Sequence, residues 1–230
     1  MWPFRKTMTV VQSGILKGMS DCHSHLLSGV DDGVQTLDES LEILATMERL
    51  GVRKVWLTPH VMEDIPNETT TLQGKFQELK RSYSGTLELV LAAEYMVDNL
   101  FEERLEKDDL LPLEEGQRYL LVETSYFSPP MGLLSILQRI QKKGYYPLLA
   151  HPERYEYMQK KDYKALKEEH ISFQLNVPSL IGVYGRHVQE KAEMYDCIGC
   201  DTHSIGYYKT LVDSTMKVKI IEMLQKQSKQ

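Results

Sequence analysis

Asp21-Cys22-His23-Ser24-His25-Leu26-Leu27 is the stretch that separates the fold classes open to this chain. It overlaps the first predicted strand, about Met19–His23, and continues into the following loop. An open doubly wound sheet carries a glycine-rich phosphate loop there, whereas this chain has two histidines one residue apart. Residues i and i+2 of a strand share a face. We therefore predict that His23 and His25 enter one pocket, with Cys22 and Ser24 facing away.

The rest of the chain alternates between short apolar runs and amphipathic patterns, with no internal repeat. Six further strands are predicted at about Val52–Thr58, Leu87–Ala93, Tyr119–Glu123, Tyr146–Ala150, Ile171–Asn176 and Cys197–Asp201. Helices are predicted at Leu37–Leu50, Thr69–Ser84, Leu133–Lys143, Lys161–Glu169, Val183–Tyr195 and Tyr207–Lys226. Thr36 or Asp38 is placed to cap the first helix, and Gly51 and Gly144 to end two of them. Seven strand–helix steps predict a parallel barrel with its functional groups at the carboxyl ends of the strands.

Isolated histidines and acids stand where most of these strands would end. They are Asp32, His60, Glu94, Glu123 and His151, and Asp201-Thr202-His203 repeats the spacing of His23 and His25 near the other end of the chain. Nitrogen and carboxylate ligands collected from many strands make a polynuclear metal site. The set therefore predicts a metal-dependent hydrolase. His170 and His187 lie in charged helical surroundings and are assigned no role.

The donor types define the expected chemistry. Imidazoles and carboxylates without a thiolate favour Mn, Fe or Zn over Mg or Ca. Such ions lower the pKa of bound water and neutralise phosphate oxygens. Arg154 follows His151 by three residues and is a candidate bidentate clamp for a phosphate, the alternative being a surface ion pair with one of the glutamates beside it. The identity of the general acid is left open, with metal-bound water, Asp21 and Asp31 as the candidates.

The composition fits one globular enzyme domain, with 230 residues of which 42% are hydrophobic and 26% charged. A net charge of -6 argues against a nucleic-acid binder that relies on a general basic surface. It does not exclude an anionic substrate, because bound cations would dominate the local field. Three cysteines make no disulfide framework and fit a reducing cytoplasm. The sequence predicts neither a signal peptide nor membrane insertion.

The motifs, taken in order, resemble a known family. His-x-His, Asp, Thr-x-His, Ala-Glu, Glu, Ala-His-x-Glu-Arg-Tyr and Asp-x-His are similar to the polymerase-and-histidinol-phosphatase (PHP) superfamily. Within it, Asp-x-His-Ser-His, Val-Asp-Asp-Gly and Ala-His-Pro-Glu-Arg-Tyr most resemble the bacterial capsule-biosynthesis tyrosine phosphatases, over about Asp21 to His203. The resemblance implies an α/β fold, a distorted seven-stranded (β/α)7 TIM-like barrel of the PHP type over residues 19–230, after an N-terminal extension over residues 1–18.

The resemblance also implies three divalent metal ions, with Mn the first expectation and Fe or Zn the alternatives. His23, His25, Glu94 and Asp201 would hold one ion, Glu94 would bridge to a second completed by Glu123 and His151, and Asp32, His60 and His203 would hold the third. Arg154 would bind the substrate phosphate, and Arg154 and His203 are the residues expected to act in catalysis. Relatives often carry an Arg-Pro pair after the last motif, where this chain has Lys209, which lacks the planar fork of arginine.

Thiol chemistry is the alternative phosphatase mechanism, and it needs Cys-x5-Arg. Six residues beyond the three cysteines stand Ser28, His203 and Gly206, none of them arginine. Cys22 and Cys200 alternate with proposed ligands, so we expect both to pack outside the barrel as small apolar side chains.

We therefore interpret the chain as a cytoplasmic, metal-dependent protein-tyrosine phosphatase, a phosphoric monoester hydrolase that acts on a phosphorylated tyrosine kinase of capsule or exopolysaccharide synthesis. The protein substrate rests on resemblance alone. One alternative is a small-molecule phosphomonoesterase such as a histidinol-phosphate phosphatase, and another is a regulatory metal-binding module without turnover. The complete ligand set disfavours the module, and the short chain, which leaves little room for a substrate-enclosing insertion, favours an open site.

Overall fold

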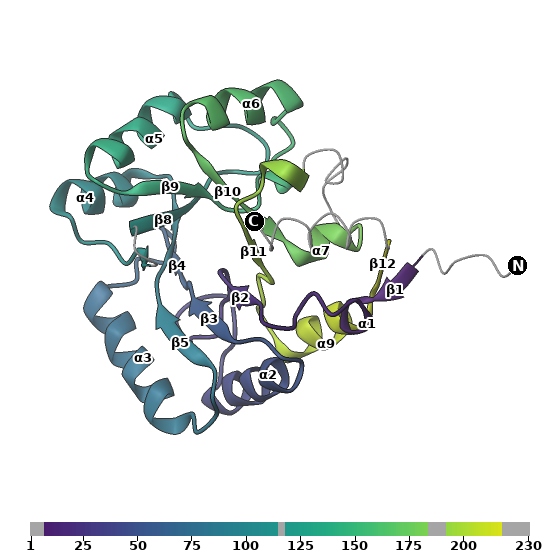
Figure 1. The fold of residues 1–230 in the computed structure, drawn as a ribbon. Helices are drawn as coiled ribbons and strands as arrows, with labels where there is room; N and C mark the ends of the chain where they lie inside the picture. Colours follow the sequence, from purple (N-terminus) through teal and green to yellow (C-terminus); the bar gives the residue numbers. More distant parts are fainter. Residues whose placement is uncertain (1–6, 115–117, 184–191, 218–230) are drawn as a thin grey trace, which may run out of the picture.

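The structure is a computed structural model and describes residues 7–114, 118–183 and 192–217. Strands and helices alternate along the chain, and the long helices lie on the outer side of a curled sheet (Figure 1). The strands are β1 (Thr7–Thr9), β2 (Ser20–Asp21), β3 (Lys54–Leu57), β4 (His60–Val61), β5 (Glu88–Leu91), β6 (Glu94–Met96), β7 (Leu113–Glu114), β8 (Arg118–Glu123), β9 (Tyr146–Leu149), β10 (Ser172–Asn176), β11 (Cys197–Gly199) and β12 (Thr215–Lys217).

The helices are α1 (Val10–Ser13), α2 (Leu37–Arg49), α3 (Thr69–Ser82), α4 (Asn99–Lys107), α5 (Leu133–Lys142), α6 (Lys160–Glu168), α7 (Val177–Leu180) and α9 (Ile205–Asp213), with short 3-10 helices η1 (Pro152–Arg154) and η2 (Ala192–Met194). Thr36 caps α2 by accepting a hydrogen bond from the Glu39 N–H at 3.3 Å. Gly51 and Gly144 follow α2 and α5 at φ of 89° and 85°, which confirms their predicted role in ending these helices. Among the described residues, every helix is too short or too polar to span a bilayer.

The sheet is mostly parallel and runs in the order β11-β10-β9-β8-β6-β4, with β7 antiparallel against β8, and a second group runs β2-β3-β5. The two groups continue into one another, because β3 leads into β4 and β5 into β6. Hydrogen bonds from Ala92 N to Leu57 O (2.9 Å) and from Glu94 N to Pro59 O (3.1 Å) carry the pairing across the two breaks. At the far side, Cys22 N bonds to Ile198 O at 3.3 Å and Ser24 forms a parallel bridge with Thr202, which brings β2 beside β11.

Each of the seven predicted strands overlaps an observed one, but, besides the four-residue helices α1 and α7, one longer helix was missed. That helix is α4, which begins after Asp98, whose carboxylate accepts from the Phe101 N–H at 2.9 Å. Its buried face contains Arg104 between Phe101 and Leu105. This charged residue interrupts the apolar spacing by which an amphipathic helix is predicted.

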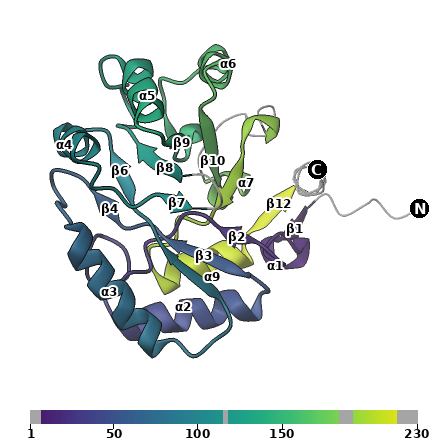
Figure 2. The same ribbon diagram turned by 60° about the vertical axis from the view of Figure 1, so that its left-hand side comes forward.

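The predicted helix Tyr207–Lys226 was wrong at residues 214–217. The backbone at Ser214 is extended, and Thr215–Lys217 forms β12, which pairs antiparallel with β1 near the other end of the described chain (Figure 2). A local pattern cannot show a strand partner that is so distant in sequence. The remainder of that helix, most of the predicted Val183–Tyr195 helix, and His187 lie outside the described residues.

Two apolar clusters hold the fold together. The larger one joins the helices to the outer face of the sheet. The smaller, inner cluster consists of Cys22, Trp56, Ala92, Leu113, Leu121, Leu148 and Ala150. Ala92 and Leu121 stand two residues before Glu94 and Glu123, so the inner cluster shares a sheet face with the predicted ligands.

The two cysteines expected outside the sheet lie on different sides of it. Cys200 packs in the larger cluster, as expected, but Cys22 belongs to the inner cluster. The prediction for Cys22 was wrong because β2 ends at Asp21, and the strict alternation of side chains ends with it. The Sγ atom of Cys22 lies 2.7 Å from that of Cys197.

Candidate metal centre

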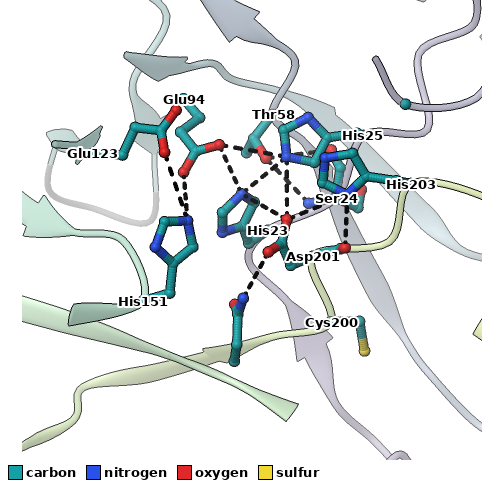
Figure 3. Close-up of polar contacts among 12 residues, drawn as sticks. His23, Ser24, His25, Thr58, Glu94, Glu123, His151, Cys200, Asp201 and His203 are labelled. Atoms are coloured by element: carbon teal, nitrogen blue, oxygen red, sulfur yellow. Dashed lines mark hydrogen bonds and ion pairs between the residues drawn. The ribbon is translucent and has the colours of Figure 1, made fainter. Parts of the chain in front are cut away.

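The structure brings all nine predicted ligands together at the carboxyl ends of the sheet strands. Figure 3 labels His23, His25, Glu94, Glu123, His151, Asp201 and His203 among them. His23 and His25 follow β2, His60 and Glu94 begin β4 and β6, Glu123 ends β8, His151 follows β9, Asp201 and His203 follow β11, and Asp32 lies in the loop before α2. Parallel strands present their carboxyl ends at one edge, so short motifs far apart in sequence reach one volume.

Glu94 lies at the centre of the group and is fully buried. Its Oε2 is 3.1 Å from His23 Nε2, 3.4 Å from His25 Nε2 and 3.2 Å from His60 Nδ1. Its Oε1 is 3.0 Å from His151 Nε2. One carboxylate among four imidazoles is therefore placed to serve more than one cation.

The remaining carboxylates surround this centre. Asp201 Oδ1 lies 3.3 Å from His25 Nε2, and Glu123 Oε1 lies 3.2 Å from His60 Nδ1. Asp32 is at the open edge, with its side chain 65% exposed and its Oδ1 3.5 Å from His60 Nε2 and 3.6 Å from His203 Nε2. Most of the group is closed to solvent, and the edge formed by Asp32 and His203 is where a substrate can approach.

Three overlapping sets of side chains offer donor atoms that all lie within 4.8 Å of one another: His25, Asp32, His60 and His203; His23, His25 and Glu94; and His60, Glu94 and Glu123. His25 and His60 thus occur in sets beyond those that the family resemblance assigns to them. The sharing follows from geometry, because the centroids of the His25 and His60 rings are only 4.3 Å apart.

The donors fit cations better than they fit one another. Nε2 of His23 and Nε2 of His25 face each other at 3.1 Å, and both oxygens of Glu94 are buried without a hydrogen bond from the described residues. Buried polar atoms in native proteins are nearly always satisfied. Here several nitrogen and oxygen lone pairs point at the same positions, and few N–H or O–H groups lie between them. This arrangement is the one expected of the ligands around a metal ion.

The charges of these groups are strongly coupled. Burial alone would lower the pKa of His23, but Glu94 and Asp201 raise it to about 9. Burial would raise the pKa values of Glu94 and Asp201, but His23 and neighbouring imidazoles hold both well below the usual range. Metal binding would release the imidazolium protons, because imidazole is a ligand only in its neutral form.

Sequence reasoning missed two residues that orient the ligands from behind. Gln174 Oε1 lies 3.0 Å from His23 Nδ1 and accepts from the His151 N–H at 3.0 Å. Asn176 Nδ2 donates to Asp201 Oδ2 at 2.7 Å. Both come from β10, where two amides at i and i+2, each directly after an apolar residue, were the available signal. Hydrogen bonds of this kind fix the orientation of metal ligands.

Asp31 has a similar orienting role. Its Oδ2 lies 2.9 Å from His25 Nδ1 and accepts from the His60 N–H at 3.0 Å. Burial would raise the pKa of Asp31, but the bond to His25 lowers it to about 2. An ionised Asp31 suits the orientation of a ligand better than the general-acid role considered from sequence. Asp21, the other candidate, accepts from two backbone N–H groups, and burial raises its pKa to about 6.

Arg154 ends η1, three residues after His151, and its guanidinium points toward the cluster. Its Nη1 donates to Asp201 Oδ2 at 3.0 Å, and its Cζ lies 4.2 Å from the ring centre of Tyr126. The side chain is 25% exposed, so the guanidinium reaches solvent beside the buried ligands. Lys209, in contrast, pairs with a glutamate of α2 at 2.9 Å on the exposed surface between α2 and α9.

Comparisons with known proteins find tyrosine-protein phosphatases among the relatives of this chain. Tyrosine-protein phosphatase YwqE of Bacillus subtilis (strain 168) is 26% identical over 199 residues, covering 81% of this chain and 78% of the relative. Tyrosine-protein phosphatase CpsB of Streptococcus pneumoniae is 28% identical over 191 residues, covering 77% of each chain.

The fold also matches a solved structure. It comes from crystallography of YwqE from Bacillus subtilis and CpsB from Streptococcus pneumoniae, described there as metal-dependent tyrosine phosphatases, and has a TM-score of 0.76 at 24% identity. The match covers 90% of this chain and 87% of that one. The family model for capsular polysaccharide synthesis, CpsB/CapC, matches residues 19–224, and the chain therefore belongs to the CpsB/CapC family.

Proposed function

We propose that this chain is a metal-dependent protein-tyrosine phosphatase, a phosphoric monoester hydrolase. The observation that carries the proposal is the convergence of five imidazoles and four carboxylates beside the partly exposed Arg154. The YwqE and CpsB relatives bear the name of this activity. A cysteine nucleophile is not part of the proposal, since no arginine stands six residues after any cysteine.

The metal content we propose is three divalent ions, with Mn expected first and Fe or Zn as alternatives. His23, His25, Glu94 and Asp201 would hold one, Glu94, Glu123 and His151 a second, and Asp32, His60 and His203 the third, with His25 and His60 close enough to be shared. When bound, such ions activate water as a nucleophile and withdraw charge from the phosphate.

The architecture we propose around this site is the seven-stranded PHP-type barrel. The parallel bridge between Ser24 and Thr202, which follow β2 and β11, supports closure of the curled sheet. The division into an extension over residues 1–18 and a barrel domain over residues 19–230 stays a prediction.

The chain's own groups have separate tasks in this proposal. Arg154 binds phosphate oxygens through its planar fork. His203 lies at the open edge, and a contact of 2.9 Å between its Nδ1 and the Asp201 carbonyl turns its Nε2 toward Asp32. The two amides of β10 keep their imidazole and carboxylate partners in place. A departing tyrosine has a pKa of about 10, so it needs less protonation than an alkoxide.

The substrate we propose is phosphotyrosine on a tyrosine kinase of capsule or exopolysaccharide synthesis, in the cytoplasm, which the three free cysteines support. The exposed edge at Asp32 supports a protein substrate, because a side chain projecting from a polypeptide can reach it. The rival substrate is a small phosphomonoester such as histidinol phosphate.

One assay tests the proposal. Phosphate release from a phosphotyrosine peptide and from histidinol phosphate is measured side by side, with added Mn and after chelation. We expect faster turnover of the peptide, loss of activity with the chelator and recovery with Mn. A preference for histidinol phosphate would favour the rival substrate, and full activity in metal-free protein would reject the mechanism.

A further inference from the structure

The loop that follows β8 stands at the carboxyl edge of the sheet and is fastened to the segment that carries Arg154. Thr124 N donates to Tyr155 Oη at 3.2 Å, and Glu156 N donates to the Tyr126 carbonyl at 2.8 Å. The position of this loop is therefore fixed relative to the proposed phosphate-binding arginine.

Consecutive residues of this loop, which spans residues 124–132, face the site and the solvent. The Tyr126 ring centre lies 4.2 Å from Arg154 Cζ and 5.9 Å from the His151 ring centre. The next side chain, Phe127, is 74% exposed. Because neighbouring Cα atoms are about 3.8 Å apart, the exposed Phe127 stands close to Arg154 and the proposed metal ligands.

Exposure of large apolar side chains is concentrated here. Among the described residues, six large apolar side chains are exposed, and three of them, including the two most exposed, fall between 127 and 134. They are Phe127, Met131 at 98% and Leu134 at 40%. Pro129 and Pro130 lie between them and restrict the backbone. Concentrated exposed apolar area marks interaction surfaces on soluble proteins.

We propose that Phe127, Met131 and Leu134, the apolar rim residues, bind apolar side chains that flank the phosphotyrosine of a peptide substrate. This inference rests on the proposed function and adds the substrate class: a phosphotyrosine segment with an apolar residue within about three positions, since an extended chain advances about 3.3–3.6 Å per residue. Met131 is suited to varied partners, because its unbranched side chain adapts its shape.

Continuity with the site identifies the occupant as the substrate peptide. Tyr126 contacts Arg154 and is followed directly by the exposed Phe127, so a peptide whose phosphate meets Arg154 has this part of the rim beside it. A second copy of the chain is the competing occupant. The two differ in their kinetic consequences, because substrate contacts remote from the phosphate affect peptide substrates and leave a small aryl phosphate unchanged.

The experiment compares two variants with the holoenzyme as purified. Phe127→Ser with Met131→Ser removes the apolar rim, and Val11→Ser, which replaces an exposed apolar residue of α1, is the matched control. Three substrates are used: a phosphotyrosine peptide with leucine at flanking positions, the same peptide with serine there, and p-nitrophenyl phosphate.

We expect the double variant to lose on the order of 10-fold in kcat/KM on the leucine peptide, mainly through KM. Its kinetics on p-nitrophenyl phosphate, its metal content and its melting temperature should match the wild type, and Val11→Ser should behave as the wild type on all three substrates. Wild-type kcat/KM should be higher for the leucine peptide than for the serine peptide.

Three results would overturn the inference. One is equal kcat/KM of the wild type for the two peptides. Another is an equal loss of kcat/KM on p-nitrophenyl phosphate, which would show that the double variant disturbs Arg154 or the proposed metal ligands. The third is a wild-type dimer that the double variant converts to a monomer, which would assign the rim to a second copy. Failure of the proposed function is distinguishable, because the wild type would then hydrolyse none of the aryl phosphates.

Discussion

Glu94 is a buried carboxylate whose two oxygens lie among four imidazoles. An ordinary core would hold an apolar side chain there, as it does two residues earlier at Ala92. A buried charge is costly unless it is paired or coordinates a metal. The position of Glu94 is therefore best explained by the cations that it and the surrounding imidazoles can share.

Arg154 offers the first test at this scale. We expect Arg154→Ala to keep its metals and fold but lose on the order of 10²-fold in kcat/KM on aryl phosphates, a barrier increase of about 2.7 kcal/mol. The reason is loss of a cation from phosphate oxygens that the metals leave uncovered. Arg154→Lys should recover part of the rate, because lysine keeps the positive charge but lacks the planar fork of the guanidinium. Steady-state kinetics with metal analysis measure this, and an undiminished rate in Arg154→Ala would remove the role.

Asp201 and Cys200 are adjacent, and replacing each separates metal chemistry from thiol chemistry. Asp201→Ala should lose bound metal and nearly all turnover, since the carboxylate contacts three imidazoles and Arg154. Cys200→Ser should keep both, apart from a modest loss of stability at a buried site. Elemental analysis and phosphatase assays decide between them. A dead Cys200→Ser beside an active Asp201→Ala would contradict the proposed mechanism.

Residue type decided which site positions could be predicted from the sequence. The convergence of the nine proposed ligands was predictable because imidazoles and carboxylates at strand ends have no routine structural use in such numbers. Gln174 and Asn176 were not, since a polar amide in a strand has many ordinary uses. Cys22 was placed on the wrong face because β2 is only two residues long.

At the scale of helices and strands, the geometry of the candidate metal centre is determined by where the strands end and begin. The interruptions between β3 and β4 and between β5 and β6 place His60 and Glu94 at the first positions of new short strands. Sequence patterns located the apolar runs but not these breaks, across which backbone hydrogen bonds continue the pairing. The missed α4 and the lost end of the last predicted helix have the same origin: Arg104 and β12 are stabilised by partners distant in sequence.

Gly199 in β11 shows how closely the elements approach. A Cβ at this position would overlap the Cβ of His23 and lie 2.9 Å from Gln174 Nε2. We therefore expect Gly199→Ala to displace His23 and to reduce metal content and activity together, measured on purified protein. Gly74→Ala in α3 is the matched control, because a Cβ there meets no atom within 4 Å. Equal metal content in both variants would show that the strand can move aside without cost.

At the scale of the whole molecule, the ligands come from both ends of the described chain and from most strands between them. Ions bound at this centre therefore connect β2, β8, β9 and β11 at once. Ligands that bind only the folded state stabilise it by mass action, by about 2.7 kcal/mol at a concentration about 100 times Kd.

Chelation should consequently lower the melting temperature of the intact protein, and added Mn should restore it in a concentration-dependent way. Differential scanning calorimetry with and without chelator measures the shift, and Asp201→Ala serves as the control because it should respond weakly to either treatment. A wild-type melting temperature that changes with neither chelator nor Mn would argue against ions at the centre.

His151 and Asp201 have left-handed backbone conformations, with φ of 32° and 52°. Residues with a Cβ adopt this region at a cost of about 1–3 kcal/mol when the surroundings enforce it. Glycine would relieve that strain at either position and would also remove a proposed ligand. Directed evolution for heat resistance in metal-poor medium, with no demand on turnover, should therefore enrich glycine or asparagine at these two sites early. The same substitutions would then raise the thermal stability of the chain and remove its phosphatase activity.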